Sequence, residues 1–428
     1  MSKLDIFMLV VRVAFSAFVP LCFIAVCVWM ERRGAGFFQD RSGPNRANIF
    51  GFRAAGLVQN LSDAVKLIFK EDVTSAHIKH KFYFVLAPVL VFFTALVSFA
   101  VVPFADTLVI GGKSYIMQGI PIDLGILWFL ALAGFSVYGI ILAGWSSTNK
   151  YGILGGLRSA AQVISYEIPM GLAVISLLVV YGTVNLNEMA QFQGRLLFGF
   201  IPMWGAILQP LSMVIFIVAA FAETNRTPFD LAEGESELVA GYHVEYSAMK
   251  FAVFFMGEYV ALFASSAIIV TLFFGGYQIP FLATATLVKG AKPVAFLLMI
   301  LLPVAMYYFA GWIRRNNVSH YPRENDPRVF EANIYIKCFW ALVIFLELVL
   351  LAILFSESGG SAAHIFVALL QVGTFLLKVT LMLFVYIWVR WTLPRFRYDQ
   401  LQKLGWQMLL PLALLNIFIT SAFVVALS

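Results

Sequence analysis

The sequence predicts an all-α polytopic membrane protein with about ten transmembrane helices and one interfacial amphipathic helix. Of its 428 residues, 61% are apolar and 12% are charged, and the mean hydropathy is +0.88. This composition excludes an ordinary soluble domain. The apolar residues also form separate runs of about 20 residues, which is the length that a helix needs to cross a bilayer. We therefore expect residues 1–428 to form a single transmembrane helical domain.

Ten apolar runs are long enough to span a membrane. They fall at about 5–30, 82–105, 122–145, 158–183, 202–222, 249–275, 294–313, 331–356, 363–390 and 406–427. The first run is too long and too apolar for a cleaved signal peptide, and it has no small-residue cleavage site. We therefore expect it to be the first span.

The positions of Lys and Arg predict how these helices are oriented. Of the 29 Lys and Arg residues, 22 lie in or beside five alternate loops, at 31–81, 146–157, 223–248, 314–330 and 391–405. Loops rich in Lys and Arg stay on the cytoplasmic side, so we expect these five to be cytoplasmic and both termini to lie outside. The net charge of +6 is divided among short loops rather than gathered on one face, which argues against nucleic acid as a partner.

The cysteines and histidines argue against a metal or redox group in this chain. Cys22, Cys27 and Cys338 lie in apolar runs without the paired spacing of an iron–sulfur or zinc site. The five histidines are scattered, and two haems would need four of them facing one another inside the bundle. There is also no flavin motif and no glycine pattern of a dinucleotide site. We expect no haem, iron–sulfur cluster, flavin or metal, and no catalytic redox residue.

The cytoplasmic loop at 31–81 contains the pattern of an amphipathic helix. Leu57, Leu61, Val65 and Ile68 recur at helical spacing, and polar residues occupy the opposite face. A helix of this kind lies in the plane of the lipid headgroups. Its simplest role is that of a surface anchor.

The cytoplasmic segment at 223–248 is unusually acidic and is expected to form a loop with a helix. Its carboxylates are Glu223, Asp230, Glu233, Glu235, Glu237 and Glu245, and Arg226 lies among them. Carboxylates this close repel one another, so some are expected to hold protons near neutral pH. Thr227-Pro228-Phe229-Asp230 is a helix-start pattern, which would place Glu233 and Glu237 on one helix face. A solvated acidic loop is the alternative.

The span at 158–183 carries the clearest carboxylate within the membrane, Glu167. A charge at that depth is costly and is by default a candidate for function. Pro169 interrupts the helical hydrogen bonds nearby and predicts a kink or a bound water beside Glu167. The alternative is that a hydroxyl of Tyr166 or Ser165 simply binds the carboxylate.

Three further buried charges are Glu258, Glu347 and Lys378. Glu347 and Lys378 lie at similar depths in adjacent antiparallel spans, so we hypothesise that they form an ion pair. The ninth span ends in a basic, aromatic tail. Its cations are Arg390, Arg395, Arg397 and Lys403. Such a tail is typical of binding to anionic lipid, and a docking surface for a soluble partner is the alternative.

Five segments resemble, in the same order, the membrane subunit at the junction of the two arms of respiratory complex I, the proton-pumping NADH:quinone oxidoreductase. This is the family of the bacterial H-type subunit of NADH-quinone oxidoreductase and of mitochondrial NADH dehydrogenase subunit 1. The segments are ERRGAGFFQDRSGPNR, LVQNLSDAVKLIFKED, GWSSTNKYGILGGLRSAAQVISYEIP, AETNRTPFDLAEGESELVAGYHVEY and WVRWTLPRFRYDQLQKLGW. The resemblance covers roughly 1–275 and 365–428, and five motifs in order make it specific.

The resemblance implies roles for two sets of residues. Those of an acidic proton path would be Glu167, Glu223, Glu233, Glu235 and Glu237, with Glu245 as a further candidate. Those of a quinone access channel and the interface with the peripheral arm would be Glu31, Arg32, Gln39, Arg41, Asp63 and Arg226.

The resemblance also implies a substrate, partners and a location. Quinone would be bound as substrate, and electrons would come from the quinone-site and iron–sulfur subunits of the peripheral arm. Small membrane-arm subunits and membrane lipid would be further partners. The chain would be a non-redox subunit of a multisubunit NADH:quinone reductase that translocates protons. A bacterial plasma membrane, the inner membrane, is favoured over that of mitochondria.

The chain departs from the family pattern in three places. Ala47 and Asn48 replace a Val-Gly pair, and Thr148 replaces an Asn. The family core has eight spans, so two helices at about 290–360 are predicted to be an inserted hairpin. Adding two spans preserves the orientation of everything that follows.

Two alternatives remain open at this point. The first is the homologous membrane subunit of an energy-converting hydrogenase or formate-oxidising complex, which shares the acidic motifs. The second is a secondary transporter, which would explain buried charges without partner subunits. A transporter predicts inverted internal repeats, and the sequence has no such symmetry.

Overall fold

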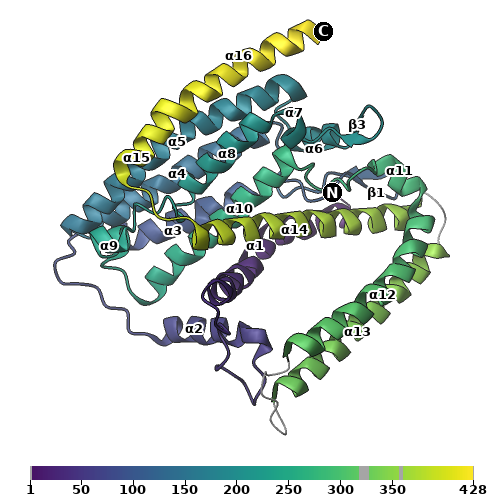
Figure 1. Ribbon diagram of the computed structural model, residues 1–428, viewed down its shortest axis with the longest axis horizontal. Coiled ribbons are helices and arrows are strands. Elements are labelled where there is room, and N and C mark those ends of the chain that lie inside the picture. The colour runs from purple at the N-terminus through teal and green to yellow at the C-terminus, as the bar shows by residue number, and fades with distance from the viewer. Residues whose placement is uncertain (1, 318–326, 356–359, 428) are drawn as a thin grey trace.

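Helix α10 (Ala248–Phe273) lies at the centre of the fold. Of its most apolar stretch, 72% is buried, which exceeds the value for every other described helix of spanning length. Helices α1 (Lys3–Phe38), α3 (Lys81–Phe99) and α14 (Ser361–Thr392) pack around it. The computed structural model describes residues 2–317, 327–355 and 360–427 (Figure 1).

The remaining elements are mostly helices. In chain order they are the 3₁₀ helix η1 (Ala54–Gly56), α2 (Leu57–Phe69), β1 (Leu108–Ile110), β2 (Lys113–Tyr115), α4 (Gly125–Ser146), α5 (Lys150–Tyr181), α6 (Leu186–Gln193), β3 (Leu196–Leu197), β4 (Ile201–Pro202), α7 (Gly205–Leu208), α8 (Pro210–Glu223), α9 (Glu235–Leu238), the 3₁₀ helix η2 (Gly241–His243), α11 (Thr284–Lys289), α12 (Ala291–Asn317), α13 (Pro327–Leu354), α15 (Tyr398–Lys403), the π-helical turn η3 (Leu404–Leu409) and α16 (Leu410–Leu427). Strands β1 and β2 form one antiparallel hairpin, and β3 and β4 form another.

Nine helices in the described ranges are long and apolar enough to cross a membrane, and they correspond to nine of the ten predicted spans. The predicted span at 202–222 was wrong as a single helix, because the structure divides it into α7 and the 14-residue α8. At the break, Gln209 donates to Thr420 at 2.9 Å and accepts from Asn416 at 3.0 Å. Pro210 then begins α8, a position where its missing N–H does not matter.

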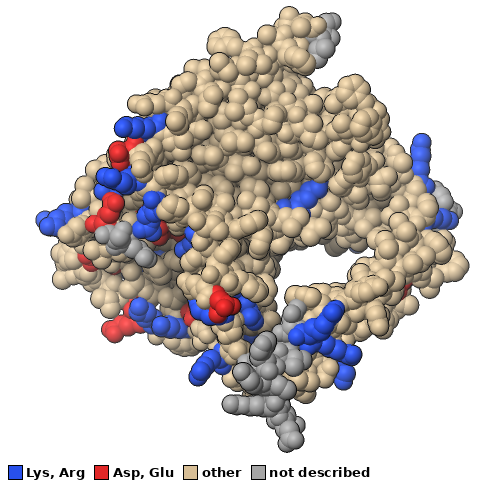
Figure 2. Space-filling model, in the orientation of Figure 1, with Lys and Arg blue, Asp and Glu red and all other residues tan. Residues whose placement is uncertain are grey.

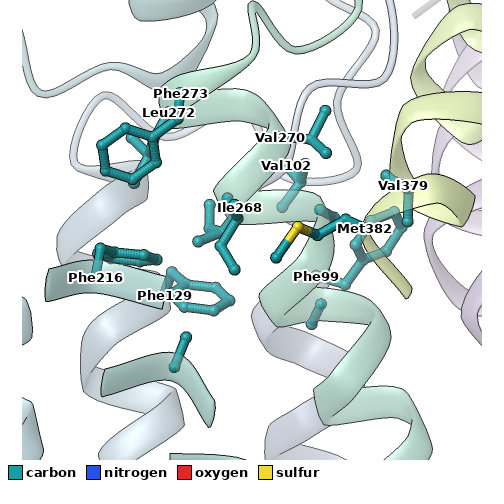
Figure 3. Close-up of a cluster of buried hydrophobic side chains, with 14 of the residues drawn as sticks. Phe99, Val102, Phe129, Phe216, Ile268, Val270, Leu272, Phe273, Val379 and Met382 are labelled. Atoms are coloured by element: carbon teal, nitrogen blue, oxygen red, sulfur yellow. The ribbon is translucent and has the colours of Figure 1, made fainter. Parts of the chain in front are cut away.

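An apolar cluster joins five helices at the middle of the molecule (Figure 3). Phe99 of α3, Phe129 of α4, Phe216 of α8 and Ile268 of α10 are at most 3% exposed, and Val379 of α14 closes the cluster. In a membrane, close packing rather than exclusion of water holds such helices together. The cluster therefore fixes α10 between the helices on either side of it.

The predicted amphipathic helix is present as α2, and its two faces differ as expected. Leu61 and Ile68 are more than half exposed on the apolar face. On the polar face, Asn60 Nδ2 donates to Ala25 O at 2.7 Å and Asp63 forms an ion pair with Arg32, both on α1. The polar face thus fixes α2 to α1 and directs the apolar face away from the protein.

The predicted hairpin is present as α12 and α13, which pack on each other through an apolar seam that includes Ala310 and Ile336. At the end near α11, Leu350 packs with Phe366 of α14. Figure 1 shows the hairpin standing beside the bundle and joined to it at its ends. Residues 318–326 of the predicted basic loop, including His320, lie outside the described residues.

Most charged side chains visible in Figure 2 lie along the left and lower sides of the molecule, around α9, α15, α2 and the lower end of the α12–α13 hairpin, and most of the rest of that face is uncharged. Helices α2, α9 and α15 belong to the segments at 31–81, 223–248 and 391–405. Three of the five loops predicted to be cytoplasmic therefore lie in this charged region.

Candidate functional site

A buried glutamine of α5 holds the acidic segment in place. Gln162 Nε2 donates to Ala222 O at 2.6 Å, to Phe229 O at 2.7 Å and to Asn225 Oδ1 at 3.1 Å. Gly155, two turns earlier on α5, lies so close that a Cβ there would come within 2.7 Å of the segment's backbone. Since buried carbonyls need donors, Gln162 determines the path of the chain beyond α8.

The acidic segment does not form the helix that was predicted to begin at Thr227. Residues 224–234 form turns and bends, and α9 is only one turn long. The acids instead have separate partners across the fold. Asp230 binds Arg395 at 2.9 Å, and Glu237 binds Arg158 of α5 at 2.6 Å. These tertiary contacts override the local helix-start pattern, so Glu233 and Glu237 share no helix face.

Arg226 is the centre of an ionic cluster at the start of the acidic segment. Its side chain is 8% exposed, and it lies 3.6 Å from Glu31 of α1 and 3.5 Å from Glu258 of α10. The guanidinium also stacks over the Tyr259 ring, 4.3 Å from the centroid. A buried cation is tolerated only with such partners, so Arg226 depends on carboxylates from two other helices.

Glu31 and Glu258 each have further donors. The Tyr259 hydroxyl donates to Glu31 at 2.6 Å, and Arg390 at the end of α14 also pairs with Glu31. The Tyr242 hydroxyl donates to Glu258 at 2.8 Å. The cluster thus joins α1, α10 and α14 to the acidic segment through the ion pairs of Arg226 and Arg390 and the two tyrosine hydrogen bonds. A hydrogen bond to a charged acceptor is about twice as strong as a neutral one.

Two carboxyl groups beside this cluster are protonated more readily than exposed ones. Burial raises the pKa of Asp230 to about 6, although Arg395 favours the ionised form. Burial also raises the pKa of Glu233, and the nearby charges of Glu258 and Asp230 raise it further. Both groups lie in the segment between α8 and α10. Because their pKa values are raised, their charge can change when the charges around them change.

Glu167 lies within the bundle, against Gly134 of α4. A Cβ at Gly134 would come within 2.7 Å of Glu167 Oε1, so glycine makes room for the carboxylate. Glu223, at the end of α8, is close enough for its charge and that of Glu167 to repel each other. The alternative that Tyr166 or Ser165 binds Glu167 is wrong. The Tyr166 hydroxyl donates to Leu401 O at 3.0 Å, and that of Ser165 donates to the Ala161 carbonyl and the Gln402 amide oxygen.

The other predicted acids differ in their surroundings. Glu237 is half exposed and paired with Arg158. Glu245 accepts from Ser75 at 2.7 Å and from Asn149 at 2.9 Å. Burial opposes ionisation of Glu245, but these hydrogen bonds outweigh it and lower its pKa. The side chain of Glu235 lies outside the described residues.

A cavity of about 500 Å³ adjoins the ionic cluster. Its lining residues are Val28, Glu31, Arg32, Ala35, Arg41, Gly43, Pro44, Gln59, Phe255, Tyr259 and Trp391. They come from α1, the following turn, α2, α10 and α14. The lining combines an apolar and aromatic wall with charged groups, as expected of a site for an amphipathic molecule.

The six residues predicted for a channel are linked around this cavity. Glu31, Arg32 and Arg41 line it. Asp63 pairs with Arg32, Gln39 accepts a 2.7 Å hydrogen bond from Arg41, and Arg226 lies beside Glu31. The structure thus brings together residues of α1, α2 and the acidic segment that are up to 195 positions apart in the chain.

Sequence reasoning did not single out several residues of this region. Gln162, Tyr259, Tyr242 and Trp391 were missed, although Tyr259 directly follows the predicted buried charge Glu258. A tyrosine hydroxyl in a mostly apolar helix needs a polar partner, and that signal could have marked Tyr259. Two of the three partners of Gln162 are backbone carbonyls, which leave no trace in the sequence.

The hypothesised pair of Glu347 and Lys378 is wrong. Lys378 Nζ donates to the carbonyls of Phe274, Gly276 and Gln278 at 2.7–3.0 Å. Glu347 Oε1 is buried without a hydrogen-bond partner among the described residues. Lys378 binds the carbonyls exposed where α10 ends, which compete successfully for an ammonium group.

Within residues 2–317, 327–355 and 360–427, no group of three His, Cys, Asp or Glu side chains is suited to a metal ion.

The cavity and the ionic cluster together offer a pocket with an apolar wall, a charged end, and nearby carboxyl groups that can change protonation. Glu31 belongs to both the pocket and the ionic cluster. A charge that appears in the pocket would therefore act directly on the cluster.

Comparison with known proteins gives the family. Residues 11–321 and 330–421 match the family model described as NADH dehydrogenase. A protein of Salinibacter ruber, named as the H-type subunit of NADH-quinone oxidoreductase, is 40% identical over 403 residues, which are 94% of this chain and 91% of that one. A protein of Rhodothermus marinus, named NADH-quinone oxidoreductase subunit 8, is 41% identical over 397 residues, which are 92% of this chain and 91% of that one.

The similarity is wider than the sequence motifs suggested. A Solibacter usitatus protein, also named as an H-type subunit of NADH-quinone oxidoreductase, is 38% identical over 99% of both chains. The matches include α12 and α13, so limiting the resemblance to 1–275 and 365–428 was too narrow. With a family match over most of its length and relatives at about 40% identity, this chain belongs to the family of H-type subunits of NADH-quinone oxidoreductase.

Proposed function

We propose that this chain forms the quinone access channel of a proton-translocating NADH:quinone oxidoreductase, at the junction of its peripheral and membrane arms. We further propose that it couples quinone reduction to proton pumping. The observation that carries the proposal is the double position of Glu31, which lines the cavity and contacts Arg226 at 3.6 Å. The bacterial relatives favour a bacterial plasma membrane as its location.

The cavity suits a quinone by the chemistry of its lining. Val28, Phe255 and Trp391 offer an apolar wall for an isoprenoid tail, while Arg32 and Arg41 offer donors for the polar head. Quinone reduction takes two electrons and two protons. The electrons are supplied by partner subunits in the peripheral arm. The proposed role of this chain is to bind and position the quinone and to respond to its charge through the carboxyl groups nearby.

The coupling that we propose is electrostatic. Negative charge on a quinone beside Glu31 weakens the attraction between Arg226 and its own carboxylates and favours protonation of the acids nearby. Asp230 and Glu233 respond first because both interact with the charges of Glu258 and Arg226 in the cluster. Glu223 and Glu167, whose charges repel each other, continue the path into the bundle. Because the two charges repel each other, a proton on either acid favours the charged form of the other.

The first experiment tests the activity of the native assembly. The tagged chain is purified in mild detergent and assayed for NADH-dependent reduction of a short-tail quinone and for its block by a quinone-site inhibitor. We expect inhibitor-sensitive reduction from a large co-purifying complex. A large complex that evolves hydrogen instead would favour the hydrogenase-type relative, and a chain that purifies alone would favour a transporter.

The second experiment tests the proton path. Glu167→Gln and Glu223→Gln are expected to leave the complex assembled but to lower the number of protons pumped per NADH, measured in liposomes with a pH-sensitive dye. Glu188→Gln is the matched control, since Glu188 is an exposed glutamate of α6 outside the acidic segment. Unchanged stoichiometry in the first two variants would contradict the proposed path.

A further inference from the structure

At one end of the α12–α13 hairpin, two residues near the start of α13 contact the turn that precedes α2, next to segments that line the cavity. Figure 2 shows an opening between the middle of the hairpin and the rest of the molecule. Near α11 the hairpin is held by apolar packing, in which Leu287 and Ala363 are at most 2% exposed. At the opposite end, polar and aromatic groups of α13 meet the turn that precedes α2.

Glu331 makes the first of these contacts. Its side chain is 5% exposed, and its Oε1 accepts a hydrogen bond from the backbone N–H of Arg53. A carboxylate is expensive to bury, so apolar packing of the hairpin alone does not account for an acid here. The contact joins positions 278 residues apart in the chain.

Tyr335, one turn further along α13, makes the second contact. Its ring lies 5.6 Å from that of Phe52, and its hydroxyl is near the charged group of Arg33 on α1. The hydroxyl also lies beside the backbone of Ala55. Glu331 and Tyr335 therefore contact neighbouring residues of a single turn, 52–55.

This turn packs against segments that line the cavity. Ala55 O accepts hydrogen bonds from Trp29 and Arg33 of α1, at 2.9 and 2.7 Å. Gly56 (φ +98°) is the N-cap of α2 and lies against Pro44, which lines the cavity. Only glycine adopts this backbone conformation readily and leaves space for Pro44 O. A shift of the turn would therefore move both Pro44 and the start of α2.

We propose that Glu331 and Tyr335 are positioning residues. Together they form what we call the latch, the contacts of Glu331 with Arg53 and of Tyr335 with Phe52. The latch holds the turn at 52–55 in place and so keeps the cavity wide enough to admit quinone. The proposal rests on the proposed function, because it assumes that the cavity admits quinone. It gives the hairpin a role in quinone binding without direct contact between Glu331 and the substrate.

The test uses the assembled complex and separates binding from turnover. Glu331→Ala removes the acceptor, whereas Glu331→Gln keeps a carbonyl oxygen that can accept from the Arg53 N–H. We expect Glu331→Ala to raise the quinone KM by about 3–10-fold with kcat unchanged. This is less than the factor of about 10 or more for direct loss of one hydrogen bond to a charged group, because the effect on the cavity is indirect. Glu331→Gln is expected to stay within about 2-fold of the wild type.

A double-mutant cycle and a control complete the kinetic test. Phe52→Ala and Tyr335→Ala should each raise KM, and their effects should be less than additive because the rings contact each other. Leu348→Ala, on the exposed side of α13, should change nothing. A fall in kcat at unchanged KM, or a glutamine variant as impaired as the alanine one, would overturn the latch.

Limited trypsin digestion distinguishes failure of the latch from failure of the proposed function. Trypsin cleaves after Arg46 and Arg53, so release of the turn should speed cleavage there in Glu331→Ala and not in Glu331→Gln or Leu348→Ala. This readout needs no quinone. Equal cleavage rates in all variants would overturn the latch, whereas faster cleavage in Glu331→Ala without inhibitor-sensitive quinone reduction would contradict only the function.

Discussion

Two buried cations, Arg226 and Lys378, are stabilised by different kinds of partner. Arg226 lies among side chains that can gain or lose protons, with Glu31 at 3.6 Å and Glu258 at 3.5 Å. Lys378 donates to three backbone carbonyls at 2.7–3.0 Å and lies over the Trp204 ring. Carboxylates change charge when they bind a proton, whereas carbonyl dipoles do not.

The difference predicts which of the two regions responds during turnover. Around Arg226, protonation of one carboxylate changes the balance of charge for every neighbour. Around Lys378, the partners are fixed by the end of α10 and the turn at Gly275 and Gly276, both at positive φ. We therefore expect changes near Arg226 to alter activity, and changes at Lys378 to alter stability alone.

The largest effect is expected from Arg226→Met. Removing one member of a buried ionic cluster leaves Glu31 and Glu258 without their shared cation, a change that typically costs about 3–5 kcal/mol. We expect most of the complex to fail to assemble. The measurement is the amount of intact complex on a native gel relative to the wild type.

Arg226→Lys sharpens this prediction because it keeps the charge but not the forked geometry. Lysine cannot bridge two carboxylates as guanidinium does, and it loses the stacking on Tyr259. We expect assembly with reduced turnover. If Arg226→Met instead assembles and turns over normally, the ionic cluster has no structural role.

The next effect is expected from Gly134→Ala, which tests the position of Glu167. Alanine favours a helix more than glycine does, yet its Cβ would come within 2.7 Å of the Glu167 carboxylate. We expect proton pumping to fall in liposomes while the complex remains assembled. In a Glu167→Ala background, Gly134→Ala should cause no further loss of pumping, because no carboxylate remains to be displaced.

Gly171→Ala provides the control for this substitution. Gly171 lies on α5, in the same span as Glu167, and a Cβ there would meet nothing within 4 Å. It should pump like the wild type. An equal loss in both alanine variants would indicate a general effect on the helices rather than contact with Glu167.

A smaller effect concerns the pH dependence that Asp230 contributes. With its pKa raised to about 6, Asp230 is charged above that pH and loses its ion pair with Arg395 below it. Because the folded-state pKa exceeds the ordinary value of 3.8, this group favours the folded state at low pH, and that contribution disappears as the pH rises to about 6. We expect Asp230→Asn to remove an inflection near pH 6 from the quinone KM.

The check is a KM profile from pH 5 to 8 for both proteins. Asparagine keeps an acceptor for Arg395 but cannot change charge, so only the titration is removed. An inflection near pH 6 that persists in Asp230→Asn would assign it to another group, with Glu233 the first candidate.

Much of the fold could be predicted because spanning helices are visible as apolar runs. Nine predicted spans, the hairpin and the amphipathic α2 depend on local patterns, and the structure contains them. The break at Gln209 depends on Asn416 and Thr420, more than 200 residues later. Contacts at that separation cannot be read from one sequence.

The sequence predicted several residues of the candidate site but not how they are arranged. The resemblance selected Glu31, Asp63 and Arg226, and the structure brings them to one region. The helix expected from Thr227 is missing because Gln162 and Arg395 hold the segment in turns. Local propensity is a weak prior where buried partners from other helices compete for the same groups.

The smallest effect on activity is expected from Lys378→Met, the substitution that separates the two cations most clearly. The three carbonyls lose their donor, and one buried group left unsatisfied typically costs about 1–3 kcal/mol. Methionine fills a similar volume without a charge, so the complex should assemble, lose thermal stability by a few degrees, and reduce quinone at the wild-type rate per complex. Because its partners cannot change charge, a Lys378→Met complex that is stable but turns over slowly would mean that the end of α10 takes part in coupling after all.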